Sequence, residues 1–79
     1  MSKTTSDFAS LLKGKRKQVG MTQIELAEAA GVAVNSIRLY EGGKRTPSVY
    51  IALRLACALN GIKPNFTEEQ VIARLMEAE

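Results

Sequence analysis

The chain has 79 residues, 46% hydrophobic and 24% charged with a formal net charge of +3, which is typical of one small folded domain over residues 1–79. One cysteine, Cys57, allows no intrachain disulfide, and the lack of histidine removes a common metal ligand and general base, so we predict neither an enzyme nor a metal or cofactor site. The chain has no room for a ligand-binding domain, so we expect no small-molecule ligand. No apolar run reaches the roughly 20 residues that cross a bilayer and no signal segment follows Lys3, so a cytoplasmic protein without membrane contact is expected.

Two helices are predicted in the first part of the chain. One runs from about Thr5 to Gln18 and stops at Gly20. The next begins after Thr22, which forms a Thr-x-x-Glu capping box with Glu25, and ends at Gly31. The apolar positions expected to face the core are Phe8, Leu11, Leu12 and Val19, then Leu26, Ala27 and Ala30.

Two more helices follow. The third segment, Val32 to Glu41, is stopped by Gly42-Gly43. Thr46-Pro47 reads as an N-cap followed by proline at the first helical position, so a fourth helix is expected from there to about Leu59. The expected core positions are Val32, Ile37 and Tyr40, then a stripe of Val49, Ala52, Leu53, Ala56 and Leu59.

Thr67 and Gln70 form a second capping box, which predicts a last helix over residues 67–78. Five helices with no strand pattern make the predicted fold all-α. The charge is uneven along these helices. Residues 1–67 carry ten Lys or Arg against four Asp or Glu, a net +6, whereas residues 68–79 carry one against four, a net −3. This asymmetry indicates one face for a polyanion and a last helix that lies away from it.

The stretch 22–41 has the length and spacing of a helix-turn-helix. Its second helix can project into a groove only if the first braces it closely, which requires small side chains where they cross. Ala27, Ala30 and Ser36 meet that need, and Gly31 can adopt the positive φ of a tight turn.

A longer string of residues between Phe8 and Leu59 carries a family resemblance: Arg16, Gly20, Thr22-Gln23, Glu25-Leu26-Ala27, Ala30-Gly31-Val32, Ile37, Tyr40-Glu41-Gly42-Gly43-Lys44, Pro47 and Leu55-Ala56. This string resembles the lambdoid phage repressor and Cro (Cro/C1-type) helix-turn-helix family, which includes restriction-modification controller proteins and antitoxins. The resemblance implies a five-helix lambda-repressor-like domain that binds double-stranded DNA as a sequence-specific transcriptional regulator.

The resemblance also implies roles for individual residues. Arg16 and Glu41 match a pair that commonly forms a partly buried salt bridge between the first helix and the end of the recognition helix. Gln23 matches a residue that typically contacts a phosphate and buttresses the base-reading side chains. Lys44 and Arg45 are candidate contacts to the DNA backbone. Lys13 and Lys15 are further candidates, although with Lys17 they could equally form a solvated helix face.

The predicted base-reading positions lie in the recognition helix. Asn35 is the first candidate, because its amide can donate and accept as adenine requires, with a capping or solvent role as the alternative. Arg38 could reach a guanine, a phosphate or only solvent. Val34 and Leu39 replace the usual polar readers and either contact thymine methyl groups or pack at the rim. Ala33 replaces the usual Ser or Thr N-cap, which leaves the first amides free to meet a phosphate.

The last helix is expected either to complete the monomer core or to form a dimer contact through Val71, Ile72, Leu75 and Met76. We favour a homodimer, whose two recognition helices would read a palindromic operator about one DNA turn apart, and a repressor that acts by occupying a promoter. A competing interpretation is an antitoxin or coactivator-like interaction module, which the apolar Val34 and Leu39 favour.

Overall fold

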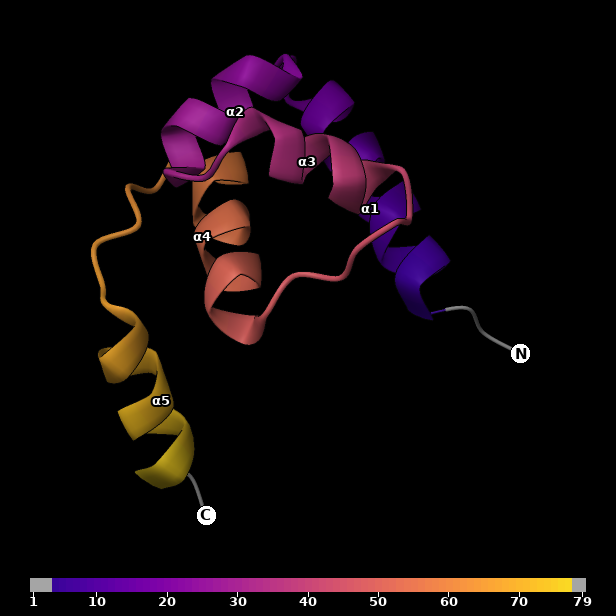
Figure 1. Cartoon of the computed structure of the whole chain (residues 1–79). Helices are drawn as coiled ribbons and strands as arrows, with labels where there is room; N and C mark the ends of the chain where they lie inside the picture. The colour runs from indigo at the N-terminus through magenta and orange to yellow at the C-terminus, as the bar shows by residue number, and fades with distance from the viewer. Residues whose placement is uncertain (1–3, 78–79) are drawn as a thin grey trace.

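The computed structural model describes the backbone of residues 4–77 and the side chains of residues 7–77. These residues form five helices and no strand: α1 (Thr4–Gln18), α2 (Gln23–Ala30), α3 (Val34–Glu41), α4 (Val49–Leu59) and α5 (Glu68–Glu77). The all-α fold predicted from the sequence is confirmed. Helices α1 to α4 form one body, and α5 extends away from it at the end of a connecting segment (Figure 1).

The core lies where α1, α2, α3 and α4 converge. Leu26, Ile37 and Leu55, one from each of α2, α3 and α4, are the largest fully buried side chains, and Leu12 of α1 joins their cluster. Burial of one such side chain stabilises a fold by about 1.5–3 kcal/mol. The short α3 is therefore held in place by contacts with its neighbours rather than by its own helical propensity.

Both ends of α2, the first helix of the helix-turn-helix, form as the sequence predicts. The Glu25 amide donates to Thr22 Oγ1 at 3.0 Å and the Thr22 amide donates to Glu25 Oε1 at 2.8 Å, which completes the capping box of α2. Gly31 ends α2 with φ 73°. The Gly31 and Val32 amides both donate to the Ala27 carbonyl, so Val32 belongs to the turn and α3 begins two residues later than expected.

The predicted start of α4 at Thr46-Pro47 is wrong. Helix α4 begins at Val49, with Ser48 as the N-cap whose hydroxyl accepts a hydrogen bond from the Ile51 amide at 3.2 Å. Thr46 and Ser48 are both hydroxyl residues that suit an N-cap. Local sequence does not distinguish them, and the structure has the later residue as the cap.

The stripe predicted for α4 is correct only in part: Leu59 packs against the core and Ala52 is half-buried, whereas Ala56 is exposed. Leu55 and Ala58 are the buried residues of α4, whereas Val49 and Leu53 remain exposed. The predicted core positions Leu11 of α1 and Val19, which directly follows α1, are likewise exposed. Leu11 and Val19 line an apolar groove of about 240 Å³ between α1 and α4, together with Phe8, Leu12, Lys15, Ala52, Leu55, Ala56, Leu59 and Asn60.

Helix α5 starts at a capping box in which the Gln70 amide donates to Thr67 Oγ1 at 3.1 Å and the Thr67 amide donates to Gln70 Oε1 at 2.9 Å. Within residues 68–77 only Val71 is buried. Just before α5, the Phe66 ring meets the Tyr50 ring of α4 edge to face, with centroids 5.9 Å apart. In the part of the chain that the structure describes, no helix combines the length and the apolar character that a membrane span requires.

Candidate nucleic-acid interface

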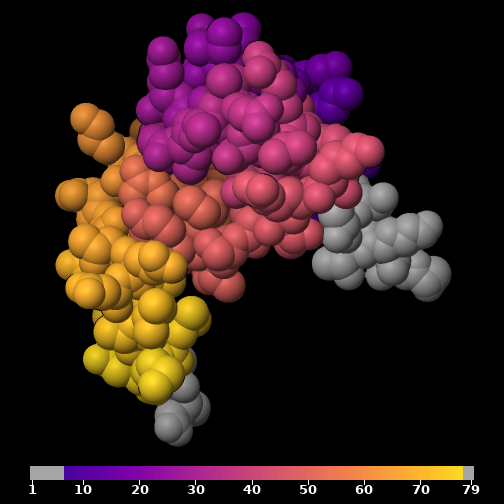
Figure 2. All heavy atoms as spheres, viewed as in Figure 1, coloured from indigo at the N-terminus to yellow at the C-terminus, as the bar shows by residue number. Residues whose placement is uncertain are grey.

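Helix α3 lies at the surface of the body (Figure 2). One of its faces is buried and another is open to solvent. Ile37 and Tyr40 are buried in the core, whereas Asn35 and Arg38 are exposed. A helix turns about 100° per residue, so these two pairs must point to different sides. The open edge of α3 therefore presents an amide and a guanidinium to solvent.

The two apolar candidates for base reading differ in their surroundings. Val34 and Leu39 are both half-buried, and Val34 packs against the core cluster. Ala33 is the N-cap of α3, in extended conformation, and has no side-chain group to cap the helix. The structure thus brings Asn35 and Arg38 to one accessible edge and places Val34 closer to the interior.

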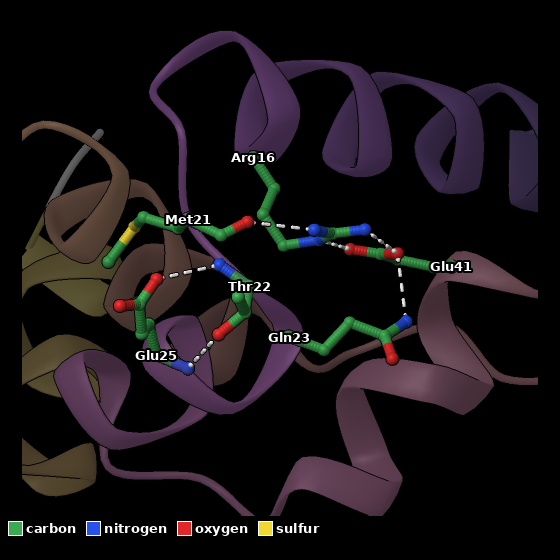
Figure 3. A network of polar contacts seen from close by, with 6 residues as sticks. All are labelled: Arg16, Met21, Thr22, Gln23, Glu25 and Glu41. Atoms are coloured by element: carbon green, nitrogen blue, oxygen red, sulfur yellow. Dashed lines mark hydrogen bonds and ion pairs between the residues drawn. The ribbon is translucent and has the colours of Figure 1, made fainter.

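An ion pair holds the C-terminal end of α3 against α1. Arg16 Nε donates to Glu41 Oε2 at 2.6 Å and Arg16 Nη2 donates to Glu41 Oε1 at 3.0 Å, while Nη1 donates to the Met21 carbonyl at 2.8 Å (Figure 3). The two side chains are only 9% and 3% exposed. The Arg16–Glu41 salt bridge expected from the resemblance is confirmed, and its two parallel bonds fix the orientation of both groups.

Electrostatics around Glu41 favour its charged form. Burial alone would raise the pKa of this carboxyl, but hydrogen bonds from Arg16 and Gln23 and the positive charges of Arg16 and Lys13 outweigh it, so the pKa lies below the usual value. The hydrogen bond to Glu41 likewise raises the pKa of Arg16 against the effect of burial. The pair is charged at neutral pH.

Gln23 extends this network to the first turn of α2. Its Nε2 donates to Glu41 Oε1 at 3.1 Å, and its own side-chain oxygen points away from the ion pair (Figure 3). An amide nitrogen carries two hydrogens, so Gln23 retains a second donor. Its side chain is thus oriented by the same carboxylate that orients Arg16.

The four basic candidates fall in different places. Lys44 and Arg45 are exposed in the loop after α3. Lys13 stands three residues before Arg16 on α1, so it lies near the side of the helix that faces Glu41. Lys15 lines the groove between α1 and α4 instead. The structure separates the two lysines of α1 that the sequence grouped together.

Sequence reasoning assigned no role to Arg54, which contacts the turn of the helix-turn-helix from α4. Arg54 Nε donates to the carbonyl of Ala30, the last residue of α2, at 2.6 Å. Arg54 Nη1 donates to the Tyr50 hydroxyl at 2.9 Å. The spacing of Tyr50 and Arg54 at i and i+4 indicates that they are neighbours on one helix, but the contact of Arg54 with α2 depends on tertiary packing.

The candidate dimer residues lie on α5, far from α3 in the view of Figure 1. Val71 is buried, whereas Ile72, Leu75 and Met76 are exposed by 51%, 56% and 78%. Two carboxylates, Glu68 and Glu69, stand in the first turn of the same helix. The acidic last helix is thus separate in space from the edge that carries Asn35 and Arg38.

Comparison with known proteins agrees with this geometry. The helix-turn-helix family profile matches residues 12–66. An HTH-type transcriptional regulator from Methanothermobacter thermautotrophicus, described as uncharacterized, is 44% identical over 50 residues, which cover 63% of this chain and 72% of that protein.

Solved structures of two restriction-modification controller proteins are similar. C.AhdI from Aeromonas hydrophila is 31% identical with a TM-score of 0.71, over 77% of this chain and 91% of that protein. A point mutant of C.Esp1396I has a TM-score of 0.72 over 99% and 98% of the two chains, and at 20% identity it shows likeness of fold alone. With the profile match and the braced α3, these similarities show that the chain belongs to the Cro/C1-type helix-turn-helix family of DNA-binding transcriptional regulators.

Proposed function

We propose that this protein is a repressor that binds a palindromic DNA operator as a homodimer. The observation that carries the proposal is the arrangement of α3. Its Ile37 side is buried, its Asn35 side is open to solvent, and its C-terminal end is fixed by the Arg16–Glu41 ion pair. A short helix that is rigidly braced from behind can enter the major groove without losing its orientation.

In the proposed complex the open edge of α3 reads the bases. Asn35 would form two hydrogen bonds with an adenine, and Arg38 would contact a guanine or a neighbouring phosphate. Leu39 would lie against a thymine methyl group at the rim. Val34 packs against the core, so it would contact the bases less than Asn35 does.

Phosphate contacts would flank this edge. Lys44 and Arg45 are exposed just after α3, and Gln23 keeps a free amide hydrogen at the start of α2. Lys13 lies near the side of α1 that faces Glu41, which favours it over Lys15 as a further contact. Each such contact would add affinity that is independent of sequence and weakens with salt.

The second subunit would supply the other recognition helix. The exposed Ile72, Leu75 and Met76 of α5 form the candidate interface, with Val71 supporting them from the interior. Regulation of a cytoplasmic protein of this kind would follow from its concentration and the occupancy of its operator. The similarity to C.AhdI, a restriction-modification controller protein, supports such a role.

A selection experiment tests the proposal. Binding to a random duplex library at physiological salt, followed by sequencing of the bound fraction, is expected to return an inverted repeat with half-sites about one turn apart. Sedimentation of the complex is expected to give two chains per duplex. Recovery of no consensus would contradict the repressor and favour an antitoxin or coactivator-like module that uses this fold to bind a protein.

A further inference from the structure

Helix α2 ends with carbonyl groups that no longer have partners within the helix, and this end is where the chain turns into α3. The Ala27 carbonyl is satisfied by the amides of Gly31 and Val32. The Ala30 carbonyl accepts its hydrogen bond from Arg54 Nε of α4 at 2.6 Å. A positive charge is favourable at a helix C-terminus, and a hydrogen bond from a charged donor is stronger than one between neutral groups.

The guanidinium of Arg54 also lies directly against the turn glycine. A Cβ atom added to Gly31 would stand 2.5 Å from Arg54 Nη2 and 3.5 Å from its central carbon. Gly31 is required for its positive φ of 73°, and a side chain at this position would also displace the Arg54 guanidinium, the flexible end of its side chain, from its present place. The turn and the guanidinium fit each other as a pair.

Two contacts hold Arg54 in that position. Its Nη1 donates to the Tyr50 hydroxyl at 2.9 Å, and its central carbon lies 5.5 Å from the centroid of the Tyr50 ring. The Tyr50 ring in turn meets Phe66, which directly precedes the capping box of α5. A continuous set of contacts thus leads from the α2–α3 turn through α4 to the start of α5.

We propose that Arg54 is a positioning residue for DNA recognition, which sets the orientation of α3 by fixing the end of α2 to α4. The Arg16–Glu41 pair holds the C-terminal end of α3, and Arg54 holds the turn that leads into its N-terminal end. Both ends are then fixed, and the Asn35 edge has one orientation relative to the body. This inference rests on the proposed function.

Arg54→Met tests the inference, because it keeps the apolar stem and removes every guanidinium contact. At a temperature where all variants are fully folded, Arg54→Met is expected to weaken binding to the selected duplex by about tenfold and to change binding to random duplex no more than the control does. The control is Arg74→Met on the exposed surface of α5, which removes the same charge. Arg54→Lys, which retains a charged donor, is expected to recover part of the selectivity.

A second measurement does not depend on DNA. Amide hydrogen exchange of the free Arg54→Met protein is expected to rise more in residues 31–37 than in α1, because the contact is lost locally. A double-mutant cycle is expected to show that Gly31→Ala costs less folding free energy in Arg54→Met than in the parent, since the strain of φ is common to both and only the clash differs.

The outcomes separate the two proposals. Failure of the parent protein to prefer any duplex would overturn the proposed function, and the exchange pattern and the cycle would still decide the role of Arg54. Equal losses by Arg54→Met and Arg74→Met on both duplexes, or a uniform rise in exchange with an additive cycle, would overturn the inference and leave DNA recognition intact.

Discussion

At the scale of single residues, the carboxylate of Glu41 joins three helices. It accepts hydrogen bonds from Arg16 of α1 and Gln23 of α2, and Glu41 itself is the last residue of α3. Replacement of one member of a buried ion pair leaves the other charge without compensation, which is more damaging than loss of a surface pair.

Glu41→Gln is therefore expected to lower the free energy of unfolding by about 3 kcal/mol at neutral pH, measured by urea denaturation. Glu28→Gln, at an exposed position of α2, is the matched control and is expected to have little effect.

The effect of Glu41→Gln should also depend on pH. The folded state lowers the pKa of Glu41, so its contribution is complete above the ordinary glutamate pKa of about 4.5 and is lost as the pH falls through the lower folded value. The difference in unfolding free energy between parent and variant is expected to be constant from neutral pH to just above that value and to shrink below it. A difference that persists unchanged into strong acid would contradict this account.

Asn35 gives the residue-scale prediction for recognition. Asn35→Ala is expected to weaken binding to the selected duplex by about 1–3 kcal/mol and binding to random duplex very little, as measured by fluorescence anisotropy. Alanine is the better helix former, so unfolding does not explain a loss. Asn65→Ala, in the exposed segment before α5, is the control. Equal weakening on both duplexes would argue against base reading.

At the scale of elements, the loop after α3 decides how much of the affinity is electrostatic. Lys44→Ala is expected to reduce the slope of log affinity against log salt by about one unit, because one phosphate contact is lost. Lys63→Ala removes the same charge from the segment between α4 and α5 and is expected to leave the slope unchanged. If the two variants have the same slope, Lys44 contributes only general charge.

Helix ends with a local chemical signal were predictable. The capping boxes at Thr22 and Thr67 and the left-handed Gly31 all stand where the sequence places them, because each depends on residues within a few positions. The start of α4 was predicted two residues early. Thr46 and Ser48 offer similar caps, so residues within a few positions leave the choice between them open, and α4 begins after Ser48.

At the scale of the whole molecule, α5 stands apart from the body with an apolar face uncovered in the single chain. Leu75→Lys is expected to abolish self-association, measured by sedimentation equilibrium, and to leave the helical circular dichroism unchanged, since Leu75 is 56% exposed. Glu77→Lys introduces the same side chain at a position about 200° from Leu75 and about 100° or more from Ile72 and Met76 around the helix, and it is expected to remain dimeric. A Leu75→Lys protein that still dimerises would place the interface elsewhere.

The sequence determined the five helices, the all-α fold and the Arg16–Glu41 salt bridge, because periodicity, caps and a family pattern are properties of the chain itself. Tertiary structure decided which face of an apolar helix is buried. On α4, Leu53 is exposed and Leu55 is buried. On α1, Lys13 and Lys15 lie on different sides of the helix. Tertiary structure alone brought Arg54 to the end of α2, because contacts between distant segments depend on how helices pack and not on residue spacing.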